Sequence, residues 1–303
     1  MKAVFSFWSK PFPAHRRTVW MTEAHHLYSW ALAVHAAGVH YPTSLVTDDE
    51  GKRLLVDDLG LQFGEYSVAL NGLSDMDPDW WTLSKLYTYT LQKEPFFHID
   101  SDAYLWKRLP EHVEQSPVLG QNPDPFGFGA WASVLSDIRS AFARSKRAWL
   151  PDEWTWYEAA RGGLSVAAGL VGGQRFDFLA HYGQSVMTML KHRGNTRPLA
   201  ALREKARCMV AVEEWFLQAC VEYHRGRADS PFRDIRIEYL FPSHAAAWSE
   251  REALRMGFTH LIGQAKRNPR IAGYLENRVQ RDLPALYERC REVAAARVRG
   301  GSG

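Results

Sequence analysis

Hydrophobic and polar positions along the first hundred residues follow two patterns in turn. Short runs of apolar and aromatic residues predict strands, and longer stretches with a 3.6-residue hydrophobic period predict helices. The predicted strands are residues 3–8, 44–47, 65–70 and 95–99. The predicted helices between them are residues 22–37, 52–59 and 82–92. This alternation is typical of an α/β fold in which crossover helices join parallel strands.

The remainder of the chain has longer helical patterns and fewer strands. Helices are predicted at residues 134–147, 176–193, 198–224 and 283–298, the last of them basic. Strands are predicted at residues 162–173 and 235–240, with a short strand or turn at residues 258–262. Loops are predicted at residues 121–130, which contain Pro and Gly, and at residues 151–156. The glycines of residues 162–173 indicate that the backbone passes close to a neighbour there.

Composition narrows the classes of protein that fit. With 303 residues, 46% of them hydrophobic, the chain can bury a large core, which excludes disorder. Its 37 basic and 34 acidic residues give a net charge of +3, too balanced to indicate a nucleic-acid partner. No apolar run approaches the ~20 residues of a membrane span, and the first residues lack the features of a signal peptide. Three widely spaced cysteines favour a reduced cytoplasm and argue against a structural zinc site.

Candidate chemistry gathers where the predicted strands end. Ligands bind at the carboxyl ends of parallel strands, so groups that follow different strands are expected at one sheet edge. The residues expected there are Ser6, Phe7, Trp8, Asp48, Asp100 and Asp102. Two carboxylates one residue apart repel each other and require a cation, and hard ions such as Mg²⁺ or Mn²⁺ take oxygen ligands. An ordinary turn is the alternative for residues 100–102.

A second feature is the spacing H-x-x-G-x-x-K in residues 260–266. A neutral imidazole from His260 completes a metal sphere. Gly263 lets backbone approach a phosphate, and Lys266 supplies a point charge for it. The alternative is a loop with a solvated lysine and a histidine that caps a helix.

The two motifs together resemble those of the GT-A glycosyltransferases, most closely glycosyltransferase family 8, the glycogenin and galactosyltransferase group. Lys85 in LSKL, ahead of PFFHIDSD, resembles the basic helix that precedes the D-x-D strand of that family. Residues 162–173 resemble its F-N-x-G-V stretch, and Glu213 and Glu214 stand where it carries an Asp-Gln pair. The stretches FSFWSKPF, SLVTD and THLIGQAK also resemble an uncharacterised bacterial GT-A-like family along nearly the whole chain.

The resemblance implies a fold and a domain plan. The fold is α/β, the GT-A (nucleotide-diphospho-sugar transferase-like) type, with a mixed, mainly parallel sheet flanked by helices. One catalytic domain is expected over residues 1–299, in which residues 1–110 form the nucleotide-binding half. Residues 111–299 would form the acceptor half and the C-terminal helices. Residues 300–303 (GGSG) are expected to be a cloning remnant outside the fold.

The resemblance also implies an activity, namely transfer of a sugar from a nucleotide-sugar donor, a UDP-sugar, to a glycan, peptide or small-molecule acceptor. Mn²⁺ or Mg²⁺ on Asp100, Asp102 and His260 would neutralise the diphosphate leaving group. Lys266 and the backbone of Gly263 would add positive potential there. The resemblance to family 8 favours retention of configuration.

The other candidate residues have roles implied in the same way. Lys85 would reach the sugar or a phosphate. Asp48 and residues 6–8 would contact the base and the ribose. Glu213 or Glu214 would serve as a carboxylate base in an inverting enzyme, or would hold the acceptor. Tryptophans 80, 81, 154 and 156, predicted in loops, are candidates for packing against an acceptor sugar.

Departures from the family pattern keep other functions open. Ala167 replaces an asparagine, so a sugar-binding amide is missing, and residues 267–269 (RNP) replace a Pro-Trp pair. The first alternative is therefore a non-catalytic GT-A-like module that binds a nucleotide, peptide or glycan. A phosphatase of the haloacid dehalogenase type is disfavoured, because its D-x-D lies on the first strand, whereas here it follows several strands. A third alternative keeps the fold and modifies a peptide or a small natural product.

Overall fold

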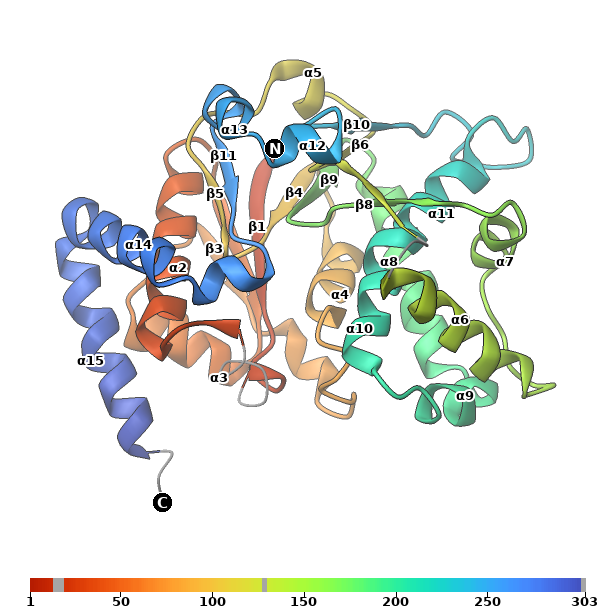
Figure 1. Cartoon of the computed structure of the whole chain (residues 1–303), viewed down its shortest axis with the longest axis horizontal. Helices are drawn as coiled ribbons and strands as arrows, with labels where there is room; N and C mark the ends of the chain where they lie inside the picture. The colour runs from red at the N-terminus through yellow and green to blue at the C-terminus, as the bar shows by residue number, and fades with distance from the viewer. Residues whose placement is uncertain (13–18, 127–129, 301–303) are drawn as a thin grey trace. The chain divides into compact units, whose positions relative to one another are not determined.

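A computed structural model describes residues 1–12, 19–126 and 130–300 of the chain (Figure 1). It is a mixed α/β protein with a mainly parallel sheet flanked by helices, as predicted. The chain forms two compact units, each assembled from segments far apart in the sequence. The N-terminal unit comprises Lys2–Met76, Ile99–Arg108 and Gly257–Gly303. The middle unit comprises Met1, Asp77–His98 and Leu109–Met256.

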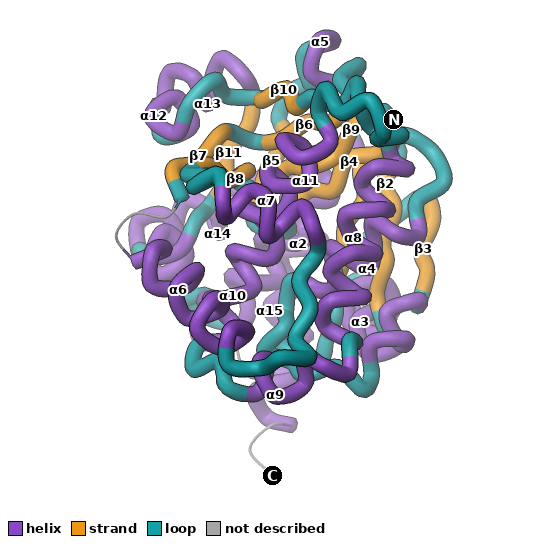
Figure 2. The backbone as a smooth tube through the Cα atoms, turned by 90° about the vertical axis from the view of Figure 1, so that its right-hand side faces the viewer, coloured by secondary structure: helices purple, strands orange, loops and turns teal. Residues whose placement is uncertain are grey.

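Three parallel strands form the sheet of the N-terminal unit. They are β1 (Lys2–Phe7), β2 (Thr43–Thr47) and β3 (Glu65–Ser67), in that order. Figure 2 shows β2 and β3 side by side. All residues of β2 and most of β1 are buried, which explains their continuous apolar pattern. The prediction of a strand over residues 65–70 is too long, because β3 has three exposed residues and a 3₁₀ turn at Ala69–Leu73 follows it.

Helices of the N-terminal unit begin at capping side chains. Thr22 caps α2 (Glu23–Gly38) by accepting a hydrogen bond from the His25 N–H. Asp48 caps α3 (Asp49–Lys52), which continues as a π-helical turn at Arg53–Asp58. The helix α14 (Pro269–Asp282), which the sequence patterns did not predict, begins at Asn268 with Pro269 in its first turn. Together with α15 (Pro284–Gly300), it packs against α2 (Figure 1).

A short antiparallel pair completes this unit. Strand β5 (Ala103–Leu105) pairs with β11 (Phe258–His260), so that Ala103 lies opposite His260. The predicted short strand or turn at residues 258–262 is therefore a strand in its first three residues. Because this pairing joins segments far apart in the sequence, it decides which side chains meet at the end of β4 (Phe96–Ile99).

The middle unit contains the strand order β10-β6-β9-β4. Strand β6 (Val118–Gly120) runs parallel to β10 (Ile237–Tyr239) and antiparallel to β9 (Leu170–Gly173). Strands β7 (Pro123–Pro125) and β8 (Leu164–Val166) form a separate antiparallel pair. The other elements of this unit are helices. They are α4 (Leu83–Leu91), α5 (Glu111–Glu114), α6 (Ala130–Ala143), α7 (Asp152–Ala159), α8 (Phe176–Lys191), α9 (Thr196–Ala200), α10 (Lys205–Val210), α11 (Phe216–His224), α12 (His244–Ala247) and α13 (Glu250–Met256).

Three predictions for the middle unit were wrong. The predicted loop at residues 151–156 is largely the start of α7, where Pro151 precedes two acidic residues that favour a helix N-terminus. The predicted loop at residues 121–130 contains β7 and the first residue of α6, and its residues 127–129 lie outside the described part of the chain. The predicted helix at residues 198–224 is divided into α9, α10, a π-helical turn at Ala211–Trp215 and α11.

The predicted strand at residues 162–173 is two strands, β8 and β9, joined by a turn. The expected close approach of backbone is confirmed at Gly172, where an added Cβ would lie 2.3 Å from the Phe96 carbonyl oxygen. All three cysteines are buried and unbridged. Within the described residues, no helix combines the length and apolar character that crossing a bilayer requires. Residues 301–303 of the expected cloning remnant lie outside the description, and Gly300 ends α15.

Candidate functional site

The D-x-D segment forms the turn between β4 and β5 in the N-terminal unit. The Ala103 N–H donates to the Asp100 carbonyl oxygen over 3.0 Å, and the Leu261 N–H donates to the Asp102 carbonyl oxygen over 2.9 Å. Helix α2 holds the turn from the other side, because the Ser29 hydroxyl donates to the Ser101 carbonyl oxygen over 2.7 Å. These bonds fix the backbone that carries both aspartates.

The carboxylates and the late histidine lie together at this turn. The potential ligand atoms of Asp100, Asp102 and His260 all lie within 4.8 Å of one another. The His260 Nε2 is 3.3 Å from the Asp102 Oδ1, and the Lys266 ammonium forms an ion pair with the Asp102 Oδ2. We refer to Asp100, Asp102, His260 and Lys266 as the acidic cluster. The sequence patterns selected all four residues, and the ion pair between Lys266 and Asp102 was not foreseen.

The charge of Asp102 is stabilised by its neighbours. Its side chain is 11% exposed. Burial opposes ionisation of this carboxyl, but the charges of Lys266 and His260 outweigh burial and hold the pKa of Asp102 well below its usual range. Asp102 is therefore a carboxylate that already has a cation as its partner.

Lys266 lies on a 3₁₀ turn, Gly263–Arg267, which follows β11. Gly263 has a φ of +54°, in the left-handed region that favours glycine, so the motif glycine shapes this turn. The Lys266 ammonium lies 5.6 Å from the centroid of the Trp20 ring. The backbone carbonyl oxygen of Lys266 accepts a hydrogen bond from the Met21 N–H over 3.2 Å. These contacts hold the lysine beside Asp102.

The residues predicted for the base and ribose have structural partners. The Asp48 carboxylate accepts hydrogen bonds from the Gly51 N–H over 2.8 Å and from the Ser9 N–H over 2.9 Å, which links the end of β1 to α3. Residues 7 and 8 are buried, and the ring centroids of Phe7 and Phe12 are 5.4 Å apart. Ser6 is half-buried. A role of Asp48 and residues 6–8 in nucleotide binding stays a prediction.

A second polar group lies in the middle unit, around Ala168. The Lys85 ammonium on α4 lies 2.6 Å from the Glu213 Oε1 and 3.3 Å from the Ala168 carbonyl oxygen. The Ala168 N–H donates to the Glu214 Oε1 over 3.3 Å. We refer to Lys85, Glu213 and Glu214 as the lysine–glutamate group. The sequence patterns named all three residues, and the structure brings them together.

The two glutamates differ in their surroundings. Glu213 is paired with the buried Lys85, whereas burial, and then the charge of Glu213, raise the pKa of Glu214 to about 8. Both lie on the π-helical turn Ala211–Trp215. A π-helical turn changes the pattern of backbone hydrogen bonds, and here the Tyr182 hydroxyl donates to the carbonyl oxygens of Val212 and Glu213 over 3.2 Å and 2.5 Å.

The tryptophan candidates separate into buried and exposed residues. Trp154 is 1% exposed and lies on α7, where its ring centroid is 4.8 Å from that of Trp215. Trp80 is 5% exposed, so both residues belong to the core instead of an acceptor surface. Trp81 is 36% exposed and Trp156 is 43% exposed, and they stay candidates.

Sequence reasoning missed several polar residues of the middle unit. The amide side chains of Gln121 and Asn122 are buried, and their backbone groups pair with Ala167, at the position where the family 8 asparagine is absent. Two histidines and a glutamate, His181, His224 and Glu153, form a further group. No local sequence motif identifies this group, because the three residues come from three separate helices.

Comparisons with other proteins place the chain in a family. The chain belongs to a family of unknown function (DUF6734), whose model matches residues 1–293. It is similar to the solved structure of the galactosyltransferase LgtC in complex with donor and acceptor sugar analogues, with a TM-score of 0.40 and 12% identity, over 98% of this chain and 96% of that chain. It is also similar to the glycosyltransferase GlyE of Streptococcus pneumoniae TIGR4, with a TM-score of 0.36 and 11% identity, over 96% of this chain and 64% of that chain. A search of curated proteins finds no match.

Proposed function

We propose that the chain is a metal-dependent glycosyltransferase that moves a sugar from a nucleotide-sugar donor, a UDP-sugar, to an acceptor. One observation carries this proposal, the convergence of the acidic cluster. Its two carboxylates come from one segment, and its imidazole and ammonium come from another that is distant in the sequence. They are the same four residues that the motif resemblance selects for metal and diphosphate binding.

The donor set of the acidic cluster fits a hard divalent ion such as Mn²⁺ or Mg²⁺. Two carboxylates and one imidazole supply mostly oxygen ligands, which such ions prefer. Asp100, Asp102 and His260 would hold the ion, which when bound supplies Lewis-acid stabilisation of the leaving diphosphate.

Other residues of the N-terminal unit would bind the donor directly. Lys266 would exchange its contact with Asp102 for one with the diphosphate, where its ammonium adds a positive charge. The turn at Gly263 would present backbone N–H groups to the same phosphates. Asp48 and residues 6–8 would position the base and the ribose.

The lysine–glutamate group of the middle unit would bind sugar hydroxyls of the donor or the acceptor. Glu214, whose pKa of about 8 keeps it protonated at neutral pH, can donate a hydrogen bond to a hydroxyl oxygen. The pair of Lys85 and Glu213 offers one donor and one acceptor group in a buried setting. Retention of configuration, and action in the cytoplasm of a bacterium, complete the proposal.

Thermal stability of the purified chain tests the donor site. We expect UDP or a UDP-sugar to raise the melting midpoint only when Mn²⁺ is present, since a ligand at 100 times its dissociation constant adds about 2.7 kcal/mol of stability. Asp102→Ala should abolish the shift, and Asp75→Ala, at an exposed aspartate of the same unit, should leave it unchanged. An equal shift for Asp102→Ala would refute the metal assignment.

Release of sugar separates the enzyme from a binding module. The absence of the family asparagine at Ala167 is the observation that favours a module without activity. Mn²⁺-dependent release of free sugar from a nucleotide sugar, lost in Asp102→Ala, is the result expected of a transferase. Metal-dependent nucleotide binding without any turnover, over a panel of donors and acceptors, would support the module instead.

A further inference from the structure

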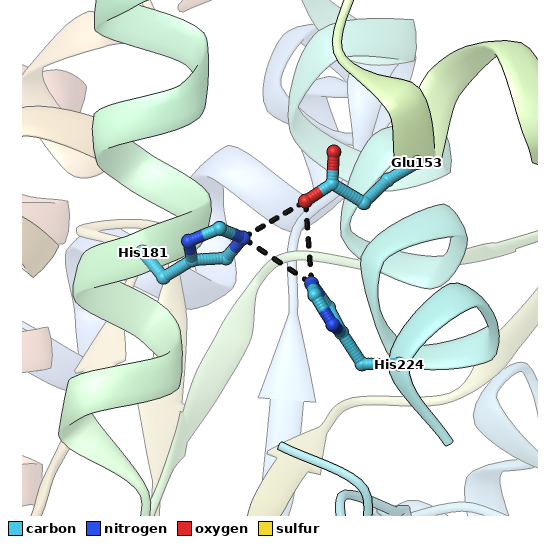
Figure 3. Close-up of side chains that lie close together, drawn as sticks. All are labelled: Glu153, His181 and His224. Carbon is cyan, nitrogen blue, oxygen red and sulfur yellow. Dashed lines mark hydrogen bonds and ion pairs between the residues drawn. The ribbon is translucent and has the colours of Figure 1, made fainter. Parts of the chain in front are cut away.

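We propose that Glu153, His181 and His224 form a second metal site, in the middle unit, for a divalent ion of the Zn²⁺ class (Figure 3). These residues play no part in the proposed function, and we refer to them as the histidine cluster. Glu153 comes from α7, His181 from α8 and His224 from the end of α11. The ion would therefore tie together three helices of the same unit.

The three side chains point their potential ligand atoms at one another. The Glu153 Oε1 lies 2.8 Å from the His181 Nε2 and 3.2 Å from the His224 Nε2, and the two nitrogens are 3.3 Å apart (Figure 3). Ligand atoms about 2.0–2.1 Å from a tetrahedral zinc ion lie about 3.3 Å from each other, so the triangle has nearly the size of one face of such a site.

The contact between the two imidazoles argues for a cation. Each Nε2 faces both the carboxylate oxygen and the other Nε2. If both nitrogens carry hydrogens, their positive ends approach each other, and if neither does, their lone pairs do. If only one carries a hydrogen, the lone pair of the other faces the carboxylate oxygen of Glu153. A positive ion attracts both lone pairs and the carboxylate together, so one ion satisfies all three groups.

The residues around the histidine cluster support metal ligation through the Nε2 atom of His224. The other ring nitrogen of His224, Nδ1, lies 2.8 Å from the Ser230 hydroxyl oxygen, which also accepts a hydrogen bond from the Phe232 N–H over 3.0 Å. A partner for the second nitrogen orients a ligating imidazole.

Two of the three ligands are buried, and the third is partly exposed to solvent. The side chains of Glu153 and His224 are 9% and 10% exposed, whereas that of His181 is 35% exposed. His181 also lines a surface cleft of about 440 Å³, together with Trp149, Asp177 and Gln184. Because His181 lines this cleft, the ion would enter past His181, and a water from the same side would be its fourth ligand.

The chemistry of the donor set selects the ion. Two imidazoles and one carboxylate prefer Zn²⁺ and its transition-metal neighbours over Mg²⁺ or Ca²⁺. The cysteine spacing, which argues against a structural zinc site, does not bear on this cluster, because its ligands are histidines and a glutamate.

Zinc uptake by chelator-treated protein tests the site. The measurement is made in an Asp102→Asn background, which disables the acidic cluster, with bound metal determined after dialysis against Zn²⁺. We expect about one zinc ion per chain, and loss of that ion in the added variants Glu153→Gln, His181→Asn and His224→Asn. At 100 times the dissociation constant, Zn²⁺ should raise the melting midpoint by about 5 °C.

His112→Gln, at an exposed histidine on α5 of the same unit, is the matched control and should retain the ion. His181→Asn is the variant least prone to misfold, because His181 is the most exposed ligand. Uptake that is unchanged in all three ligand variants would overturn the proposal, as would a parent protein that takes up no zinc. Neither result depends on sugar transfer, because the Asp102→Asn background already lacks the proposed donor site.

Discussion

The acidic cluster of the N-terminal unit and the histidine cluster of the middle unit each bring three potential metal ligands together, but they differ in charge and in support. The first has two carboxylates and one imidazole on a turn and a strand end, and a lysine pairs with it. The second has one carboxylate and two imidazoles on three packed helices.

The structural setting of each cluster indicates what role a bound ion would have there. Metal-ligating side chains on a turn at the end of a strand lie at the sheet edge where small molecules bind. An excess of negative charge there favours an ion that is shared with a phosphate. Ligands on three packed helices hold those helices together, and a neutral imidazole pair suits an ion that stays in place. We therefore expect the acidic cluster to govern turnover and the histidine cluster to govern stability.

The largest effect is expected for Asp102→Ala on sugar transfer. Removing a ligand of the proposed Mn²⁺ site should lower the transfer rate about a thousandfold, because the leaving diphosphate loses its Lewis acid. Initial rates with a UDP-sugar and saturating Mn²⁺ measure the loss. The histidine-cluster variant His181→Asn should keep most of the rate, and a comparable loss in both variants would break the distinction between the two regions.

Glu153→Ala should lower the free energy of unfolding by about 2 kcal/mol even without metal, because two partly buried imidazoles lose their shared acceptor. Denaturant unfolding in the presence of a chelator measures this change. Glu153→Gln keeps one acceptor oxygen and should cost less. Equal stability of Glu153→Ala and the unmodified protein would show that the cluster contributes nothing to the fold.

Glu214→Gln should change how stability depends on pH. The pKa of Glu214 is raised from 4.5 to about 8, so the folded state holds a proton that the unfolded state loses above pH 4.5. Stability contributed by that proton is lost as pH rises from 4.5 toward 8, with a slope of about 1.4 kcal/mol per pH unit. Glu214→Gln should lack this decline between pH 6 and 8. The same slope in both proteins would contradict the assignment of a protonated Glu214.

The smallest effect is expected for Lys266→Ala. UDP should bind about tenfold more weakly, because a charge on the diphosphate is lost, whereas uridine should bind unchanged. Without nucleotide, Mn²⁺ should bind more tightly, because Lys266 no longer competes for Asp102. Titration calorimetry measures all three affinities, and an equal loss for UDP and uridine would refute the role of Lys266.

Much of the fold follows from local patterns in the sequence. The periods of β1, α2, β2, α4 and β4 are long or apolar enough to identify each element, because their side chains meet the core at a fixed spacing. Hydrophobic periodicity did not predict the short elements. The three residues of β5 pair with β11, and Trp154 and Trp156, predicted in a loop, lie on α7. Their structure depends on partners that are distant in the sequence.

The two clusters also differ in how far the sequence identifies them. Asp100, Asp102, His260 and Lys266 stand in two compact motifs, so residue chemistry and a family resemblance selected them, and only the β5–β11 pairing brought Asp102 within reach of His260. Glu153, His181 and His224 stand in no motif, because each is a single residue on its own helix. Periodicity reports which face of a helix is buried, but the packing of helices, a long-range property, determines which buried side chains meet.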